Sequence, residues 1–172
     1  MRLFLVGYAG SGKSSLGKRL QRALGLKFVD TDKLVEQSEG ASVADIFYYQ
    51  GEKYFRCAER DIVESLAVEG FEGVVATGGG LAVWRDNMER LKQLGTTIYL
   101  RRSPEQILSR LTEYGRNKRP MFRGKSDEEL LAFMHEQLGL REPFYERAEL
   151  VIDCNKISDD EVVNRIIEYI KA

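Results

Sequence analysis

The strongest constraint on the fold is a glycine-rich motif directly behind the first apolar run of the chain. Leu3–Val6 is followed by GYAGSGKSS at residues 7–15, which fits the pattern G-x-x-x-x-G-K-[ST] without a mismatch. Its glycines let successive backbone N–H groups turn inward as an anion site, at the start of a helix expected over Lys13–Leu24. The alternative is an ordinary strand-to-helix turn with a surface lysine, which this strand–loop–helix context disfavours.

Short apolar runs alternate with longer helical patterns along the chain. Ser103, Ser126 and Ser158 each stand three residues before a Glu or Gln and predict helix N-termini. The predicted strands are Leu3–Val6, Lys27–Val29, Val74–Ala76, Thr97–Leu100 and Leu150–Ile152. This alternation predicts an α/β fold with a parallel sheet covered by helices on both faces. Together with the glycine motif it favours the three-layer α/β/α sandwich of P-loop NTPases, with a central parallel sheet of about five strands.

The composition favours one globular domain over residues 1–172. The chain is 43% hydrophobic and 31% charged with a net charge of −1, which gives no reason to expect nucleic acid or a membrane as a partner. The first apolar run is too short for a signal peptide, so we expect a cytoplasmic monomer with Cys57 and Cys154 as reduced thiols. His135 is the only histidine, which argues against a zinc site or a Ser-His-Asp triad.

The glycine motif predicts where a nucleoside triphosphate binds. Lys13 can reach the β- and γ-phosphates, and the Ser14 hydroxyl can ligate Mg²⁺. The loop residues expected to bind ATP are Gly10, Ser11, Gly12, Lys13, Ser14 and Ser15. The motif alone does not choose among kinases, motors and switches.

Two further polar segments follow predicted strands. In Asp30-Thr31-Asp32, one carboxylate could organise Mg²⁺ while the other binds an acceptor hydroxyl and takes its proton. The alternative is a helix N-cap at Asp30 or Thr31. The segment TGGG at 77–80 indicates either close backbone approach to a ligand or a flexible turn. Switch GTPases and many motor ATPases carry an aspartate there, so Asp30 is the candidate for organising the metal.

Several arginines stand where surface charge explains them poorly, although a solvated charge is the alternative for each one alone. Glu59 follows Arg56 at helical spacing and could hold its guanidinium, with Phe47 and Phe55 as apolar walls. Arg141 lies in the segment REPFY. Residues 115–124 read as a mobile basic loop with glycines at both ends and the cations Arg116, Lys118 and Arg119.

Together these segments resemble the shikimate kinase family, small P-loop kinases that use ATP to phosphorylate the 3-hydroxyl of shikimate on the route to chorismate. The resemblance covers nearly the whole chain, in the family's order and with similar spacing. Where the family's lid usually has two leucines after R-P, this chain has Met121 and Phe122. The matching segments are GYAGSGKS at 7–14, DTD at 30–32, GEKYFRCAE at 51–59, TGGG at 77–80, RPMF at 119–122 and REPFY at 141–145.

The resemblance implies a role for each matching position. Lys13, Asp32 and Arg119 are expected to be catalytic, with Arg119 carried on a lid over residues 112–125. Mg²⁺ would be held by Ser14 directly and by Asp30 through water. Residues 31–62 would form a helical substrate-binding region. The residues implied to bind shikimate are Asp32, Phe47, Phe55, Arg56, Gly78, Gly79, Gly80, Arg119 and Arg141, and those added on the ATP side are Arg110 against adenine, Asn155 on its other face and Arg119.

Other functions stay open at this point. Another small-molecule P-loop kinase, for gluconate or a nucleoside monophosphate, is the nearest alternative, and the combination of F-R-x-x-E with TGGG argues against it. A GTP-driven switch would need an aspartate where Ser158 ends the segment NKIS at 155–158. A kinase-like binding protein without activity is disfavoured by the intact Lys13, Ser14, Asp30 and Asp32.

Overall fold

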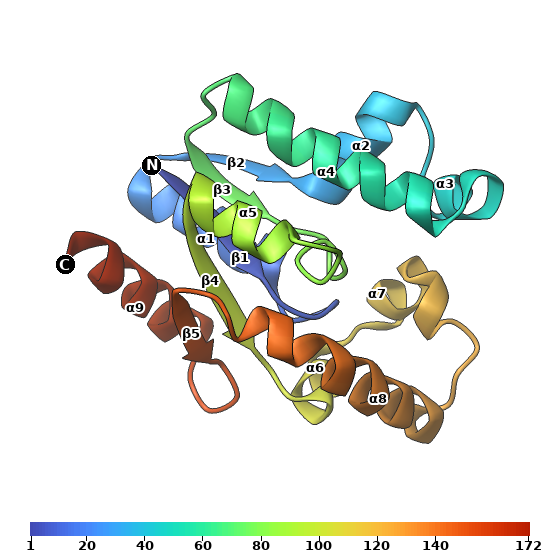
Figure 1. Cartoon of the computed structure of the whole chain (residues 1–172). Coiled ribbons are helices and arrows are strands. Elements are labelled where there is room, and N and C mark those ends of the chain that lie inside the picture. The colour runs from blue at the N-terminus through green and yellow to red at the C-terminus, as the bar shows by residue number, and fades with distance from the viewer.

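The computed structural model describes residues 1–172 and contains a five-stranded parallel sheet with helices on both faces (Figure 1). The strand order is β2-β3-β1-β4-β5, and Leu3 of the central strand pairs with Val74 on one side and Thr96 on the other. The predicted fold class and all five predicted strands are confirmed, each strand being one or two residues longer than expected. The strands are β1 (Arg2–Val6), β2 (Lys27–Asp30), β3 (Gly73–Ala76), β4 (Thr96–Arg101) and β5 (Leu150–Asp153).

The helices begin where the sequence carries capping residues. The side chains of Ser103, Ser126 and Ser158 each accept a hydrogen bond of 3.2 Å from the backbone N–H three residues further on. The three predicted caps are therefore confirmed. The helices are α1 (Lys13–Leu24), α2 (Thr31–Glu39), α3 (Val43–Gln50), α4 (Glu52–Val68), α5 (Asn87–Leu94), α6 (Pro104–Arg110), α7 (Glu113–Lys118), α8 (Asp127–Tyr145) and α9 (Asp159–Lys171), with a 3-10 turn at Pro120–Phe122.

The sheet separates two apolar cores. One core contains side chains of α1 and α9, among them Leu16 and Ile166, packed against Leu5 of β1. The other contains side chains of α4, α5 and α8, such as Leu91 and Met134. Burial of both faces of a parallel sheet explains why its strands read as continuous apolar runs.

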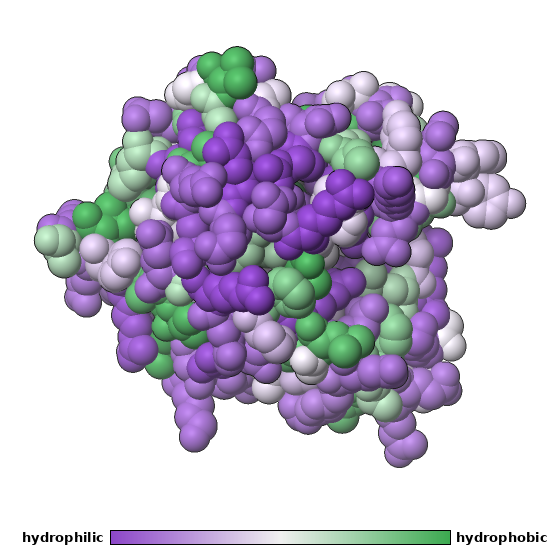
Figure 2. Space-filling view, in the orientation of Figure 1, coloured by the Kyte–Doolittle hydropathy of each residue, from purple (hydrophilic) through white to green (hydrophobic).

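Helices α2, α3 and α4 pack on one another around Val35, Ile46 and Phe55, which form a small core of their own. Figure 1 shows these helices together on one side of the sheet. Figure 2 shows a surface dominated by hydrophilic residues, with hydrophobic residues in small separate patches. None of the helices combines the length and the apolar composition that a membrane span requires.

The segment expected to be a basic loop is partly helical. Thr112 caps α7, its hydroxyl oxygen accepting from the Gly115 N–H at 3.0 Å, and Arg116 bonds Asp127 at 2.7 Å. The cap and the ion pair explain the difference, because each supplies a local partner that the loop prediction did not consider. Figure 1 shows α7 standing apart from the sheet, on the same side of the molecule as α3.

Candidate active site

The glycine loop connects β1 to α1 at the carboxyl edge of the sheet. Gly12 caps the helix with a φ of 96°, in the left-handed region that a residue with a side chain adopts at a cost. The buried Lys13 ammonium donates to the carbonyl oxygens of Gly7 at 2.7 Å and Tyr8 at 2.9 Å. Burial lowers the pKa of Lys13 to about 7, against the opposing effect of the Asp32 carboxylate. A bound polyanion would supply the missing countercharge.

Asp30 has two partners. Its Oδ1 caps α2 by accepting from the Asp32 N–H at 3.0 Å, and its Oδ2 accepts from the Ser14 hydroxyl at 2.7 Å. The helix cap that the sequence offered as one interpretation is therefore confirmed, and the same residue also faces the glycine loop, while its role toward Mg²⁺ stays a prediction. A hydroxyl and a carboxylate are the hard oxygen ligands that suit Mg²⁺, which keeps several waters when it binds protein. The residues present thus fit a magnesium ion.

The Asp32 side chain lies beside the first glycine of the triplet 78–80. A β-carbon at Gly78 would stand 2.6 Å from Asp32 Oδ1 and 2.7 Å from Glu59 Oε1, so only glycine leaves room for both carboxyl groups. Burial and the neighbouring Asp30 raise the pKa of Asp32 to about 6, while Lys13 opposes the shift. A carboxyl group with such a pKa can accept a proton near neutral pH.

Arg56 is held by a buried ion pair on α4. Its Nη1 donates to Glu59 Oε2 at 2.6 Å, which confirms the contact expected from their spacing. Burial raises the pKa of Glu59 to about 7, although Arg56 opposes the shift. The rings of Phe47 and Phe55 lie with their centroids 5.8 and 5.3 Å from the guanidinium carbon. A β-carbon at Gly80 would come within 2.3 Å of Arg56 Nη2, so this glycine also makes space.

Helix α8 brings a second arginine to the same place. Its Arg141 guanidinium carbon lies 5.8 Å from the centroid of the Tyr8 ring, and Nη1 would be 3.6 Å from a β-carbon at Gly79. The buried Tyr145 hydroxyl donates to the Gly79 carbonyl oxygen, joining α8 to the glycine triplet. Tyr145 ends the segment REPFY, and no pattern in the sequence predicts this contact.

Among the cations of the lid segment, Arg119 is the one whose charge interacts with Lys13 and Asp32 of the site. It donates to the Gly115 carbonyl oxygen at 2.8 Å and lies 5.9 Å from the Phe122 ring centroid. The charge of Arg119 adds to burial in lowering the pKa of Lys13. Burial lowers the pKa of Arg119, and the negative charge of Asp32 opposes that shift. The structure therefore gathers Lys13, Asp32 and Arg119 in one electrostatic environment.

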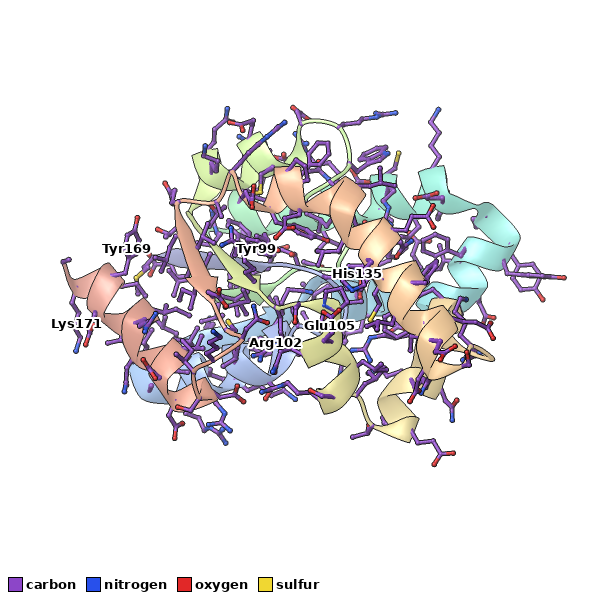
Figure 3. All side chains as sticks on the ribbon, turned by 90° about the horizontal axis from the view of Figure 1, so that it is seen from below. Tyr99, Arg102, Glu105, His135, Tyr169 and Lys171 are labelled. Atoms are coloured by element: carbon purple, nitrogen blue, oxygen red, sulfur yellow. The ribbon has the colours of Figure 1, made fainter.

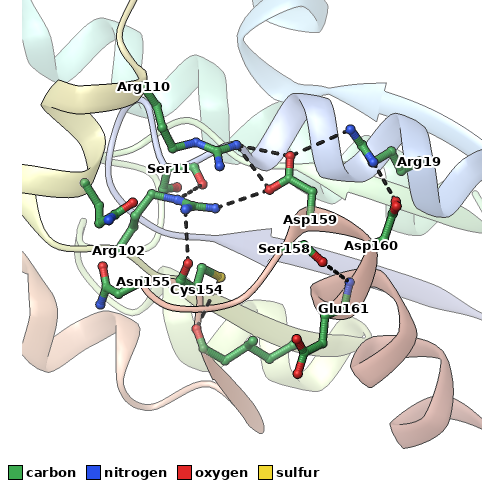
Figure 4. A network of polar contacts seen from close by, with 12 residues as sticks. Ser11, Arg19, Arg102, Arg110, Cys154, Asn155, Ser158, Asp159, Asp160 and Glu161 are labelled. Carbon is green, nitrogen blue, oxygen red and sulfur yellow. Dashed lines mark hydrogen bonds and ion pairs between the residues drawn. The ribbon is translucent and has the colours of Figure 1, made fainter.

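The residues predicted for the base of the nucleotide are Arg110, the last residue of α6, and Asn155, which follows β5. Arg110 Nη2 is 3.1 Å from both carboxylate oxygens of Asp159 (Figure 4), and Asn155 Oδ1 accepts from the Ser103 N–H at 2.8 Å. Arg102, labelled in Figure 3, is buried and donates to the Ser11 carbonyl oxygen at 3.1 Å. Sequence reasoning missed Arg102 and Asp159. A charged residue directly behind a buried strand was the available signal for Arg102.

Comparisons with known proteins agree on one family. A family model described as shikimate kinase matches residues 9–171. The chain is 42% identical over 166 residues to a shikimate kinase of Parabacteroides distasonis, covering 96% of this chain and 94% of that protein. It is 35% identical to one of Bacteroides fragilis, covering 99% and 94%.

Solved structures agree with the sequence comparisons. A shikimate kinase from Bacteroides thetaiotaomicron is similar with a TM-score of 0.89 and 34% identity, covering 100% of this chain and 99% of that one. A shikimate kinase from Acinetobacter baumannii in complex with shikimate has a TM-score of 0.85 and 31% identity, covering 98% and 92%. With a family model that spans almost the whole chain and relatives at this level of identity, the chain belongs to the shikimate kinase family.

Proposed function

We propose that this protein transfers the γ-phosphoryl group of ATP to the 3-hydroxyl of shikimate, giving shikimate 3-phosphate and ADP for the synthesis of chorismate and aromatic amino acids. The observation that carries the proposal is the buried Asp32 carboxyl, whose pKa responds to the charges of both Lys13 and Arg56 and which lies beside Glu59 against Gly78. The solved relative in complex with shikimate supports this choice of acceptor. A substrate that carries both a carboxylate and the hydroxyl to be phosphorylated needs cations around the carboxylate and a base beside the hydroxyl.

On the ATP side, the loop amides and Lys13 bind the phosphates. Mg²⁺ would be held by Ser14 directly and by Asp30 through water, and when bound it neutralises charge on the β- and γ-phosphates. The Ser14–Asp30 hydrogen bond of 2.7 Å keeps both oxygens at the mouth of the loop. Arg110 would contact the adenine from the end of α6, and Asn155 from the loop that follows β5.

On the acceptor side, Asp32 binds the hydroxyl and accepts its proton as the oxygen attacks phosphorus. Arg56 and Arg141 bind the carboxylate of shikimate, and Phe47 and Phe55 form the apolar side of the pocket around the shikimate ring. The triplet 78–80 lines the pocket with backbone alone, because side chains there would displace Asp32 and Arg56. Arg119 stabilises charge on the moving phosphoryl group.

The carboxylate clamp makes the first testable prediction. Charge-assisted hydrogen bonds contribute roughly 1.5–3 kcal/mol each, so Arg141→Lys should raise the KM for shikimate about 10- to 100-fold, because an ammonium cannot make the two-pronged contact. The KM for ATP should change little. Arg147→Lys is the control, since Arg147 is exposed just after the end of α8 and lies over the Phe144 ring. The methyl ester of shikimate should be a poor substrate, and an ester that reacts as well as the acid would contradict the clamp.

The lid makes the second prediction. Arg119→Ala should lower kcat by about 100-fold or more with ATP affinity within a few-fold, because Arg119 acts mainly on charge that develops during transfer. Lys118→Ala, at an exposed position next to it, is the control. Hydrogen exchange across residues 112–125 should slow when ADP and shikimate are both bound. Normal turnover of the variant, or exchange that ignores both ligands, would remove the lid from the mechanism.

The proposed reaction itself is tested by ADP release with and without shikimate, with the product identified by ³¹P NMR. Gluconate and AMP as acceptors distinguish the neighbouring kinase activities, and competition between ATP and GTP distinguishes a switch protein. ADP release that shikimate does not stimulate would reject the proposal.

We also propose that the protein acts as a cytoplasmic monomer with a single domain. All of the residues assigned to ATP and to shikimate come from one chain. Sedimentation of the purified protein tests the oligomeric state, and fractionation of the cells tests the location.

A further inference from the structure

One carboxylate beside the nucleotide site is shared by three arginines. Asp159 stands at the start of α9 and lies 3.1 Å from Arg110, 3.7 Å from Arg102 and 3.8 Å from Arg19 (Figure 4). Its side chain is 16% exposed. Three guanidinium groups around one carboxylate leave an excess of positive charge at this point, so the position of Asp159 governs where each of them can lie.

Arg102 is the most buried member of this cluster, with a side chain that is 1% exposed. Its Nε donates to the carbonyl oxygen of Ser11 in the P-loop, and its Nη1 donates to that of Cys154 at the end of β5. Its Nη2 has no hydrogen-bond partner, and Asp159 carries the nearest countercharge. Arg102 therefore ties the P-loop to the loop that begins at Cys154. Because an unpaired buried charge is costly, this tie depends on Asp159.

Arg110 is an exposed member of the cluster, with a side chain that is 39% exposed. Its Nη2 contacts both oxygens of Asp159 at 3.1 Å, so the carboxylate sets where the guanidinium lies. A planar guanidinium fixed in this way can pack against a flat base. Asp159 thus contacts Arg110, which is proposed to bind the base, and Arg102, which donates to the P-loop carbonyl of Ser11.

We propose that Asp159 is a positioning residue of the nucleotide site: it holds Arg110 in place for the adenine base and supplies the countercharge with which Arg102 fastens the P-loop to the loop after β5. The inference rests on the proposed ATP-dependent reaction and deepens it, since it names a residue that acts through two others.

The next residue along the chain provides a matched control. Asp160 lies in the same first turn of α9, so it shares any favourable interaction with the helix dipole. It bonds Arg19 at 2.7 Å, but its side chain is 84% exposed and it has no contact with Arg102 or Arg110. A difference between Asp159→Asn and Asp160→Asn therefore reports on those two arginines rather than on the helix.

The test uses the full chain and measures ADP binding by calorimetry, together with KM for both substrates. We expect Asp159→Asn to weaken ADP binding about tenfold and to raise the KM for ATP by a similar factor, the effect of losing about one charged hydrogen bond. The KM for shikimate should stay within about twofold. Asp160→Asn should leave all three values close to those of the wild type. A melting curve for each variant shows whether it is folded.

Two results would overturn the proposal. One is an Asp159→Asn variant that binds ADP as well as the wild type; a lower melting temperature in that variant would make the residue structural only. The other is tighter ADP binding, which would mean that the Arg110–Asp159 pair obstructs the base site. A double-mutant cycle adds a second test: with Arg110→Met already present, Asp159→Asn should cost clearly less ADP affinity than it does alone. Fully additive losses would contradict a role through Arg110.

The outcome for the reaction is separate. Wild-type protein that binds ADP but does not phosphorylate shikimate would reject the proposed acceptor and leave the role of Asp159 standing. Normal shikimate phosphorylation together with equal effects of the two asparagine variants would do the reverse.

Discussion

Replacement of Lys13 by alanine or methionine is expected to abolish phosphoryl transfer while the protein stays folded. In the proposed reaction, Lys13 contacts the β- and γ-phosphates. A preorganised cation contributes most in the transition state, when charge on the transferred group changes. Losing a single such donor commonly costs about 100- to 1000-fold in kcat. We expect a loss at the upper end of this range, because Lys13 is the P-loop's own cation.

The fold should tolerate this change. In the free protein the pKa of Lys13 falls from 10.5 to about 7 through burial. A folded-state pKa below the unfolded one means that the buried ammonium destabilises the fold at neutral pH, a cost that disappears only as the pH rises toward 10.5. Lys13→Met should therefore melt no lower than the wild type at pH 7. Lys18→Met, at an exposed position on the same helix, is the control for activity. Substantial turnover by either Lys13 variant would reject the assigned phosphate site.

Asp32→Asn is expected to lower kcat by about 100- to 10,000-fold with little change in ATP binding. Asparagine keeps the shape of the side chain but cannot accept the proton of the acceptor hydroxyl, and general-base catalysis contributes a factor of this size. Asp30→Asn is the matched comparison, two residues away. It should shift the Mg²⁺ concentration needed for half-maximal activity, because Asp30 faces Ser14 rather than the acceptor pocket. The same Mg²⁺ response from both variants would show that the two roles are not divided in this way.

The same assignment predicts a pH dependence. Burial and the charge of Asp30 raise the pKa of Asp32 to about 6. The base must be ionised to accept a proton, so kcat/KM for shikimate should rise with pH through about 6 and then level. The residual activity of Asp32→Asn should lack this step. A wild-type profile that is flat from pH 5 to 7, or a step that survives in the variant, would point to another group.

Much of this protein can be predicted from local patterns. The five apolar runs became the five strands, and the serine caps became helix starts, because both signals depend on residues close together in the sequence. The ion pair of Arg56 with Glu59 followed from helical spacing in the same way. The family was identified from segments whose joint order is specific, and the comparisons show it. The individual roles of the site residues stay predictions.

Other features depend on contacts between distant parts of the chain. No local pattern indicates why positions 78 and 80 must be glycine. A side chain at Gly78 would collide with Asp32 and Glu59, and one at Gly80 with Arg56, and these residues come from α2 and α4. The Tyr145 hydroxyl donates to the carbonyl oxygen of Gly79, which is 66 residues away in the sequence. Such contacts are selected by packing, where volume and unpaired polar atoms decide, and these quantities exist only once the elements have been assembled.

The arginines illustrate the division most clearly. The sequence does not show which partners Arg102, Arg110 and Arg116 have, although Arg102 stands directly behind a buried strand. In the folded chain, Arg102 is buried and donates to two carbonyl oxygens. Arg110 bonds Asp159, and Arg116 bonds Asp127. The sequence by itself determined the strand–helix order, the phosphate loop and the carboxylates that follow the strands, because these are encoded by neighbouring residues. Only the tertiary structure decided which charges are buried and paired, since the energy of a charge depends on everything that surrounds it in space.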